Sequence, residues 1–175
     1  MEWNYNKKIS IMIVGRGDIA SVLNDREDVT FFVSGVSNSN ETRDSEFMRE
    51  MELLDKQDRT KCLFYLSSIS VDDIEKVGGN KYLQHKRRME MLIKSNFENY
   101  NIIRIGNITW GSNPNTFINY IKNKKSKGEP VQIKDEYKYV IDKEQFVMLT
   151  DNLPSVGQNT ICVFGRMAKV AELVW

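Results

Sequence analysis

Short apolar runs alternate with amphipathic segments along most of the chain. The runs, bounded by polar residues, predict strands at 9–14, 29–36, 62–69 and 101–105. Apolar residues spaced at helical intervals among charged ones predict helices at 41–54, 80–97, 116–124 and 143–150. Further strands are expected near 131 and at 137–141, and a strand and a helix from 160 onwards. This alternation predicts an α/β fold whose mostly parallel sheet is covered by helices on both faces.

Composition limits the size and class of the protein. With 175 residues, 41% of them hydrophobic, the chain can bury one sizeable core, so we expect a single domain over 1–175. The 25 basic and 24 acidic residues nearly cancel, which argues against nucleic acid or an acidic membrane as the partner. The start of the chain lacks the apolar region of a signal peptide, and no run approaches the roughly 20 residues of a membrane span. We therefore expect a cytoplasmic protein.

The cysteines and the histidine predict neither a disulfide nor a structural metal. Cys62 and Cys162 lie in apolar runs, which predicts buried thiols and no disulfide. His85 is the only histidine, so the usual ligands of a zinc site are missing and no structural metal is expected.

A glycine-rich turn follows the first predicted strand. The sequence from Gly15 to Ala20 has the pattern Gly-x-Gly-x-x-Ala, which predicts a strand inside the sheet, a tight turn and a helix. Gly15 would permit the turn, Gly17 would let the backbone approach a pyrophosphate, and Ala20 would let the helix pack closely on the strand. Phosphate would then lie at the helix N-terminus, where free N–H groups favour an anion. A tight turn without a ligand would use the same residues.

The residue that would select the cofactor is missing. NAD-binding domains carry an acidic residue roughly 20 residues after this motif, and here the segment reads Val33-Ser34-Gly35-Val36. Arg16 could instead face a 2′-phosphate, which favours NADP over NAD. An exposed arginine without a ligand is equally ordinary.

A serine, a tyrosine and a lysine follow at a spacing that suits proton transfer. Ser68 lies at the end of the third predicted strand, and Tyr82 and Lys86 lie four positions apart on the next helix, where they share a face. A nearby ammonium lowers the pKa of a phenol from about 10, which makes tyrosine a usable acid or base. The serine hydroxyl could bond the same substrate oxygen. A tyrosine flanked by lysines is also an ordinary surface pattern.

The order of these features resembles the extended short-chain dehydrogenases, the NAD-dependent epimerase/dehydratase family. Residues 33–38 look like the strand and loop beside the cofactor in that family, and 64–71 look like its catalytic serine strand. Residues 104–111 are similar to its Arg-Pro-x-Asn-x-Tyr-Gly segment, and 137–142 resemble a later segment that ends in valine-aspartate. Two strand-helix units before residue 29 and most of the substrate domain are missing, which leaves a reduced substrate region at about 112–175.

The resemblance implies a compact, Rossmann-like NAD(P)-binding domain in shortened form that acts as a reductase or epimerase on a nucleotide-linked sugar. It implies Tyr82 as the acid/base, Lys86 as the partner that lowers its pKa and holds the nicotinamide ribose, and Ser68 as the group that orients the substrate. Ser70 and Asn107 would contact the substrate. The residues expected to bind the cofactor are Gly15, Arg16, Gly17, Asp18, Ile19, Ser34, Gly35 and Lys86.

Two functions stay open at this point. The retained Ser68, Tyr82 and Lys86 favour an enzyme. The missing ribose acid and the shortened sheet favour a catalytically inactive binding or scaffold protein that kept the fold and lost the cofactor. A homodimer through the helices at 41–54 and 80–97 is compatible with either function.

Overall fold

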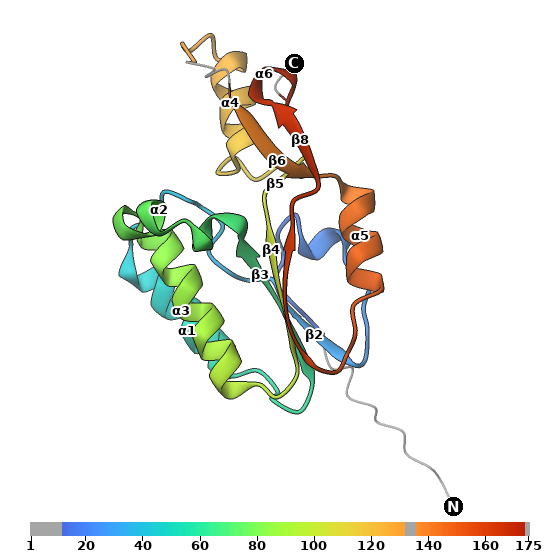
Figure 1. The fold of residues 1–175 in the computed structure, drawn as a ribbon. Coiled ribbons are helices and arrows are strands. Elements are labelled where there is room, and N and C mark those ends of the chain that lie inside the picture. The colour runs from blue at the N-terminus through green and yellow to red at the C-terminus, as the bar shows by residue number, and fades with distance from the viewer. Residues whose placement is uncertain (1–11, 132–135, 174–175) are drawn as a thin grey trace, which may run out of the picture.

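The computed structural model of the chain describes residues 12–131 and 136–173, and a five-stranded parallel sheet forms its centre (Figure 1). Each neighbouring pair of strands runs parallel. In spatial order the strands are β1 (Ile13–Val14), β2 (Val29–Phe32), β3 (Cys62–Ser68), β4 (Tyr100–Ile105) and β7 (Gln158–Val163). The predicted α/β fold with a mostly parallel sheet is confirmed.

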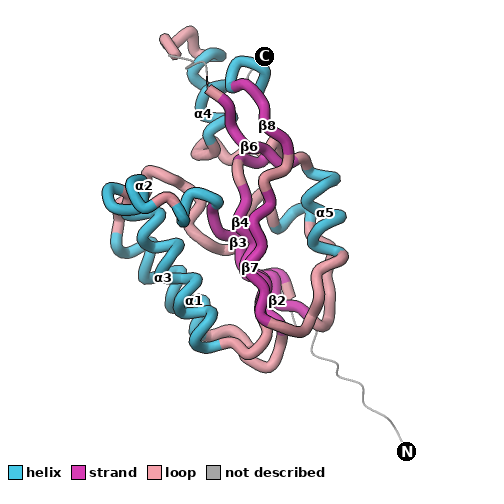
Figure 2. Tube along the Cα trace, viewed as in Figure 1, coloured by secondary structure: helices cyan, strands magenta, loops and turns pink. Residues whose placement is uncertain are grey.

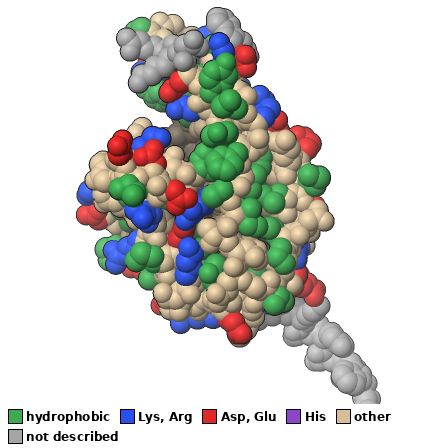
Figure 3. Space-filling model, viewed as in Figure 1, with side chains coloured by type: hydrophobic (Ala, Val, Ile, Leu, Met, Phe, Trp, Pro, Cys, Tyr) green, Lys and Arg blue, Asp and Glu red, His purple; other side chains and the backbone are tan. Residues whose placement is uncertain are grey.

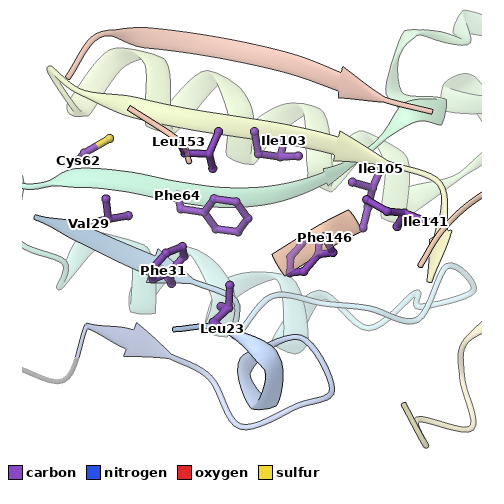
Figure 4. Close-up of a cluster of buried hydrophobic side chains, with 10 residues drawn as sticks. All are labelled: Leu23, Val29, Phe31, Cys62, Phe64, Ile103, Ile105, Ile141, Phe146 and Leu153. Carbon is purple, nitrogen blue, oxygen red and sulfur yellow. The ribbon is translucent and has the colours of Figure 1, made fainter. Parts of the chain in front are cut away.

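Helices cover both faces of this sheet (Figure 2). The helices α1 (Asp44–Asp55) and α3 (Lys81–Asn96) lie on one face, and α5 (Lys143–Asp151) lies on the other. Because side chains alternate along a strand, Tyr65 packs towards α3, whereas its neighbour Phe64 packs against Phe146 of α5 (Figure 4). Each large side chain buried in this way stabilises the fold by about 1.5–3 kcal/mol.

A second, three-stranded sheet lies at the carboxyl ends of the central strands. Its order is β5-β6-β8, with β5 and β6 parallel and β8 antiparallel to β6. Its elements are β5 (Asn107–Ile108), α4 (Phe117–Ser126), β6 (Tyr137–Ile141), β8 (Arg166–Lys169) and α6 (Val170–Leu173). Since β4 runs into β5 and β7 into β8, the small sheet stands directly beyond the central one (Figure 1).

The first strand and helix differ from the prediction. Strand β1 lies at the edge of the sheet, so its predicted place inside the sheet is wrong; positions 9–11 of the predicted strand lie outside the described residues. The predicted helix is also wrong, because Ala20–Val22 forms only a 3-10 turn, η1. Leu23 then extends into the core, and the chain passes directly to β2. No strand-helix unit intervenes that could lie on the outer side of β1.

Most other elements have the predicted type within a few residues. Strand β2 is shorter than predicted. Four elements were not predicted: the 3-10 turn η2 (Ile69–Asp72), the helix α2 (Ile74–Gly79) and the strands β5 and β8. The strand expected near 131 falls next to the undescribed 132–135.

The two cysteines differ in exposure. Cys62 is buried, as expected, whereas Cys162 is exposed because it lies on the edge strand β7. Within residues 12–131 and 136–173, no three metal-binding side chains of the His, Cys, Asp or Glu type come together. None of the helices in that part of the chain has the length and hydropathy to cross a bilayer.

Candidate functional site

A cavity of about 930 Å³ opens where the central strands end, beneath the small sheet. Figure 3 shows the surface of the molecule on one side, with hydrophobic side chains gathered where the small sheet meets the main body. The exposed aromatic rings of Tyr139 and Phe164, 5.0 Å apart, belong to the cavity wall. Open α/β sheets bind ligands at the carboxyl ends of their strands. Both the position and the volume of the cavity suit a small-molecule site.

Ser68 lies at the edge of this cavity, where β3 turns into η2. Its hydroxyl oxygen accepts a hydrogen bond of 3.2 Å from the Ser70 N–H, which caps the 3-10 turn. Arg104 of β4 holds the turn in place, because its guanidinium bonds Glu90 of α3 at 2.6 Å and Asp72 of η2 at 2.6 Å. Ser68 and Ser70 therefore have fixed positions in the cavity wall.

Tyr82 and Lys86 face the same cavity from α3. The helix begins after Asn80, whose side chain accepts a hydrogen bond from the Leu83 N–H. This start places Tyr82 in the first turn and Lys86 in the second, and the Lys86 ammonium lies 5.7 Å from the centre of the Tyr82 ring. The structure thus brings Ser68, Tyr82 and Lys86 to one cavity.

The pKa of Tyr82 departs from the expectation. Burial raises the pKa of this phenol, the Lys86 charge opposes the rise, and the Glu50 charge adds to it. The net direction is upward, so the predicted net lowering is wrong for the protein without ligands. Tyr82 carries its proton at neutral pH, and can therefore donate it.

Lys86 is buried in a polar cluster formed by Glu50, Tyr65, His85 and Lys86. Its ammonium donates to the Tyr65 hydroxyl at 3.0 Å and to the Leu66 carbonyl at 3.3 Å, and lies 3.5 Å from the Glu50 carboxylate. Glu50 is itself fully buried. Sequence reasoning missed Glu50 and Tyr65, although Glu50 shares the inner face of α1 with two buried apolar residues, Phe47 and Leu54.

Gly35 owes its identity to this polar cluster. A Cβ atom at this position would lie 2.7 Å from the Glu50 carboxylate and 3.1 Å from the Lys86 nitrogen. The neighbouring Ser34 carbonyl accepts hydrogen bonds from Arg49 of α1. Gly35 lines the cavity, whereas Ser34 does not.

The glycine turn packs against another loop of the chain. Gly15 has a φ of 147°, and a Cβ there would lie 2.8 Å from the Val33 carbonyl. The Asp18 carboxylate accepts a hydrogen bond of 2.8 Å from the Asn113 N–H, and the Asp18 carbonyl accepts one from the Trp110 indole. Only Ile19 of the turn lines the cavity; Gly15, Arg16, Gly17 and Asp18 do not. Because η1 is a single 3-10 turn, the turn lacks the α-helical N-terminus expected to hold phosphate.

Asn107 and Ser67 complete the polar wall. The Asn107 amide donates to the Tyr139 carbonyl at 3.3 Å, which ties β5 to β6. Ser67 is buried, and its hydroxyl has no hydrogen-bond partner among the described residues. The sequence did not single out Ser67, because nothing in the Ser-Ser pair shows which hydroxyl is left unpaired.

Comparisons with known proteins show the fold. No family model matches the chain, and no curated protein matches its sequence. The enzyme WbmG of Bordetella bronchiseptica, solved in complex with NAD and UDP, matches with a TM-score of 0.63 at 12% identity, over 83% of this chain and 53% of its own. Pen from Bacillus thuringiensis matches with a TM-score of 0.64 at 15% identity, over 84% of this chain and 49% of its own. This chain has their Rossmann-like fold.

A third solved structure matches this chain to a similar extent. UDP-glucose 4-epimerase of Thermotoga maritima, solved with UDP-glucose, gives a TM-score of 0.58 at 14% identity, over 84% of this chain and 59% of its own. This chain therefore spans about half the length of the structures that it matches. At such identities the likeness establishes the fold and leaves the reaction to be argued from the site.

Proposed function

We propose that this chain is an NAD(P)-dependent reductase or epimerase that acts on a nucleotide-linked sugar. The observation that carries the proposal is the shared cavity, which unites Ser68, Tyr82, Lys86 and Asn107 at the carboxyl end of the sheet. The serine and asparagine side chains in its wall, among them Ser68, Ser70 and Asn107, suit the hydroxyl groups of a sugar. The matching structures solved with NAD, UDP or UDP-glucose support the proposal through their common fold.

The chemistry of the site follows from the protonation of Tyr82. Its phenol donates the proton to a sugar carbonyl oxygen, and Ser68 bonds the same oxygen and orients it. The Lys86 charge then stabilises the phenolate until water returns the proton. NAD(P), when bound, would supply or accept the hydride. Asn107 and Ser70 are proposed to bind the substrate.

The residues that line the cavity suit the nicotinamide end of the cofactor better than its phosphates. Gly35, Ile19 and Lys86 line the cavity and are proposed to hold the nicotinamide end. For the phosphates we propose Arg16 and the backbone of the turn, with Gly15, Gly17, Asp18 and Ser34 close by. Arg16 is the only cation between positions 15 and 20, and it favours NADP.

We further propose that the chain is a shortened form of the epimerase/dehydratase family, that it is cytoplasmic and that it forms a homodimer. The direct connection from η1 to β2 supports the shortened form. The proposed dimer would form through the outer faces of α1 and α3. These faces expose Met48 and Met91 among polar and charged side chains. An interface built there would be largely polar.

The experiment that tests the proposal replaces Tyr82 by phenylalanine. We expect NAD(P)H-dependent turnover of a UDP-sugar to fall about 100-fold to 10,000-fold, because the substitution removes the proton donor. Affinity for NAD(P)H should stay near that of the unmodified protein, because the ring remains. Turnover equal to that of the unmodified protein would contradict the role of Tyr82.

A further inference from the structure

Four polar side chains, Glu50, Tyr65, His85 and Lys86, form one cluster, whereas an ordinary surface ion pair joins only two. Glu50 is 0% exposed, and both carboxylate oxygens are occupied. One accepts from the Tyr65 hydroxyl at 2.9 Å; the other accepts from the Val36 N–H at 2.7 Å and lies 2.9 Å from His85 Nε2. A buried carboxylate is tolerated only when it is paired and bonded in this way.

The same cluster also holds the Lys86 ammonium in place. The ammonium donates hydrogen bonds to the Tyr65 hydroxyl and the Leu66 carbonyl, and the Glu50 carboxylate lies 3.5 Å from its nitrogen. Tyr65 links the two charges, since it donates to Glu50 and accepts from Lys86. Lys86 is therefore held at a fixed place beside Tyr82, and it acts on the phenol through its charge.

We propose that Glu50 is a positioning residue, whose carboxylate fixes the Lys86 ammonium at the base of the cavity and balances its charge there. Its part in a reaction rests on the proposed function. Its effect on Lys86 and Tyr82 belongs to the folded chain and needs neither cofactor nor substrate.

The charges around Tyr82 show what the carboxylate does. Burial raises the pKa of Tyr82, Lys86 lowers it and Glu50 raises it, so removal of the Glu50 charge takes away one of the two effects that oppose Lys86 and should lower this pKa. The other titratable groups that face the cavity or the cluster come from β3, the residue before α2, α2, α3 and β6, and two of them, Tyr65 and His85, contact Glu50 directly. They are Tyr65, Asp73, Lys76, His85, Tyr137, Lys138 and Tyr139.

The test is a pH titration of Tyr82 in the Glu50→Gln variant, followed by NMR of 13C-labelled tyrosine. The Tyr82 resonance is assigned from its loss in Tyr82→Phe. We expect Tyr82 in Glu50→Gln to ionise at a lower pH than in the unmodified protein. The matched control is Glu52→Gln, the same change at an exposed position of the same helix, where no shift is expected. Equal Tyr82 titrations in the two variants would overturn the proposal.

A second variant decides the matter where Glu50→Gln alone does not fold. In Glu50→Gln/Lys86→Met both charges are absent, so the uncompensated ammonium is removed as well. We expect the double variant to fold even where Glu50→Gln alone does not, because the two side chains are coupled. A double variant that also fails to fold would overturn the proposal. If the Tyr82 titrations came out as expected but the unmodified protein showed no activity, that result would count against the proposed function alone.

Discussion

Replacing Gly35 by alanine puts a methyl group into the polar cluster beneath the cavity. The new Cβ would lie 2.7 Å from a Glu50 carboxylate oxygen and 3.1 Å from the Lys86 nitrogen. A free glutamate would swing aside, but Glu50 is held by the Val36 N–H and the Tyr65 hydroxyl. Either these bonds lengthen or the backbone at Gly35 moves. Overpacking of this kind costs about 1–3 kcal/mol.

Urea unfolding and thermal melting measure this cost directly. For a chain of this size the Tm should fall by roughly 2–12 °C. Gly17→Ala is the matched control, because a Cβ there meets nothing within 4 Å and the φ of Gly17 is not positive. That variant should keep its stability or gain up to about 1 kcal/mol. If Gly35→Ala were as stable as Gly17→Ala, the reasoning about the polar cluster would be refuted.

Two further predictions concern the acidic side chains. Burial raises the pKa of Glu50, but the Lys86 charge and hydrogen bonds outweigh it and hold the pKa at about 2, against an ordinary 4.5. Since the folded pKa is the lower one, the unfolding free energy should fall by about 3 kcal/mol as the pH drops from about 5 to 2. Urea titrations should show a weaker pH dependence in Glu50→Gln, and an unchanged one would contradict the assignment. Asp18→Ala should cost about 0.5–2 kcal/mol in urea unfolding, because it removes the carboxylate that accepts from the Asn113 N–H, whereas the exposed Asp25→Ala should cost little.

Local pattern was sufficient to predict the elements whose own residues decide their form. Helices α3 and α5 and strand β6 have strong periodicity or clear end signals, such as the Asn80 cap and the Asp142 capping box. Strand β1 and turn η1 depend instead on distant contacts. Leu23 leaves the helical conformation to join the core, and no strand-helix unit lies between η1 and β2 that could pair with the outer side of β1.

Two strands of the small sheet, β5 and β8, were not predicted for a related reason. Strand β5 has only two residues, and β8 exposes Arg166 and Met167 along its length. Neither carries a pattern that could be separated from a loop. Each is a strand only because it pairs with β6.

The part of the candidate site on β3 and α3 could be predicted from the sequence, whereas the glycine turn does not line the cavity apart from Ile19. The spacing of Tyr82 and Lys86 correctly placed both on one helix beside the Ser68 strand. Glu50 was not predicted, because a glutamate in a charged helix is normally solvated. Burial of Tyr82 itself, with the Glu50 charge adding to it, reverses the expected shift of the Tyr82 pKa. No spacing rule reveals a carboxylate that arrives from another helix.

The measurement that most directly tests the central claim is calorimetric titration of the unmodified chain with NADH and with NADPH, each with and without UDP-glucose. Lys86→Ala serves as the matched variant, because it alters the cavity wall that the dinucleotide is proposed to contact. The account predicts saturable binding of at least one dinucleotide below millimolar concentration, with NADPH favoured and Lys86→Ala weaker. Absence of binding by both dinucleotides at millimolar concentration, in a protein shown to be folded, would contradict it.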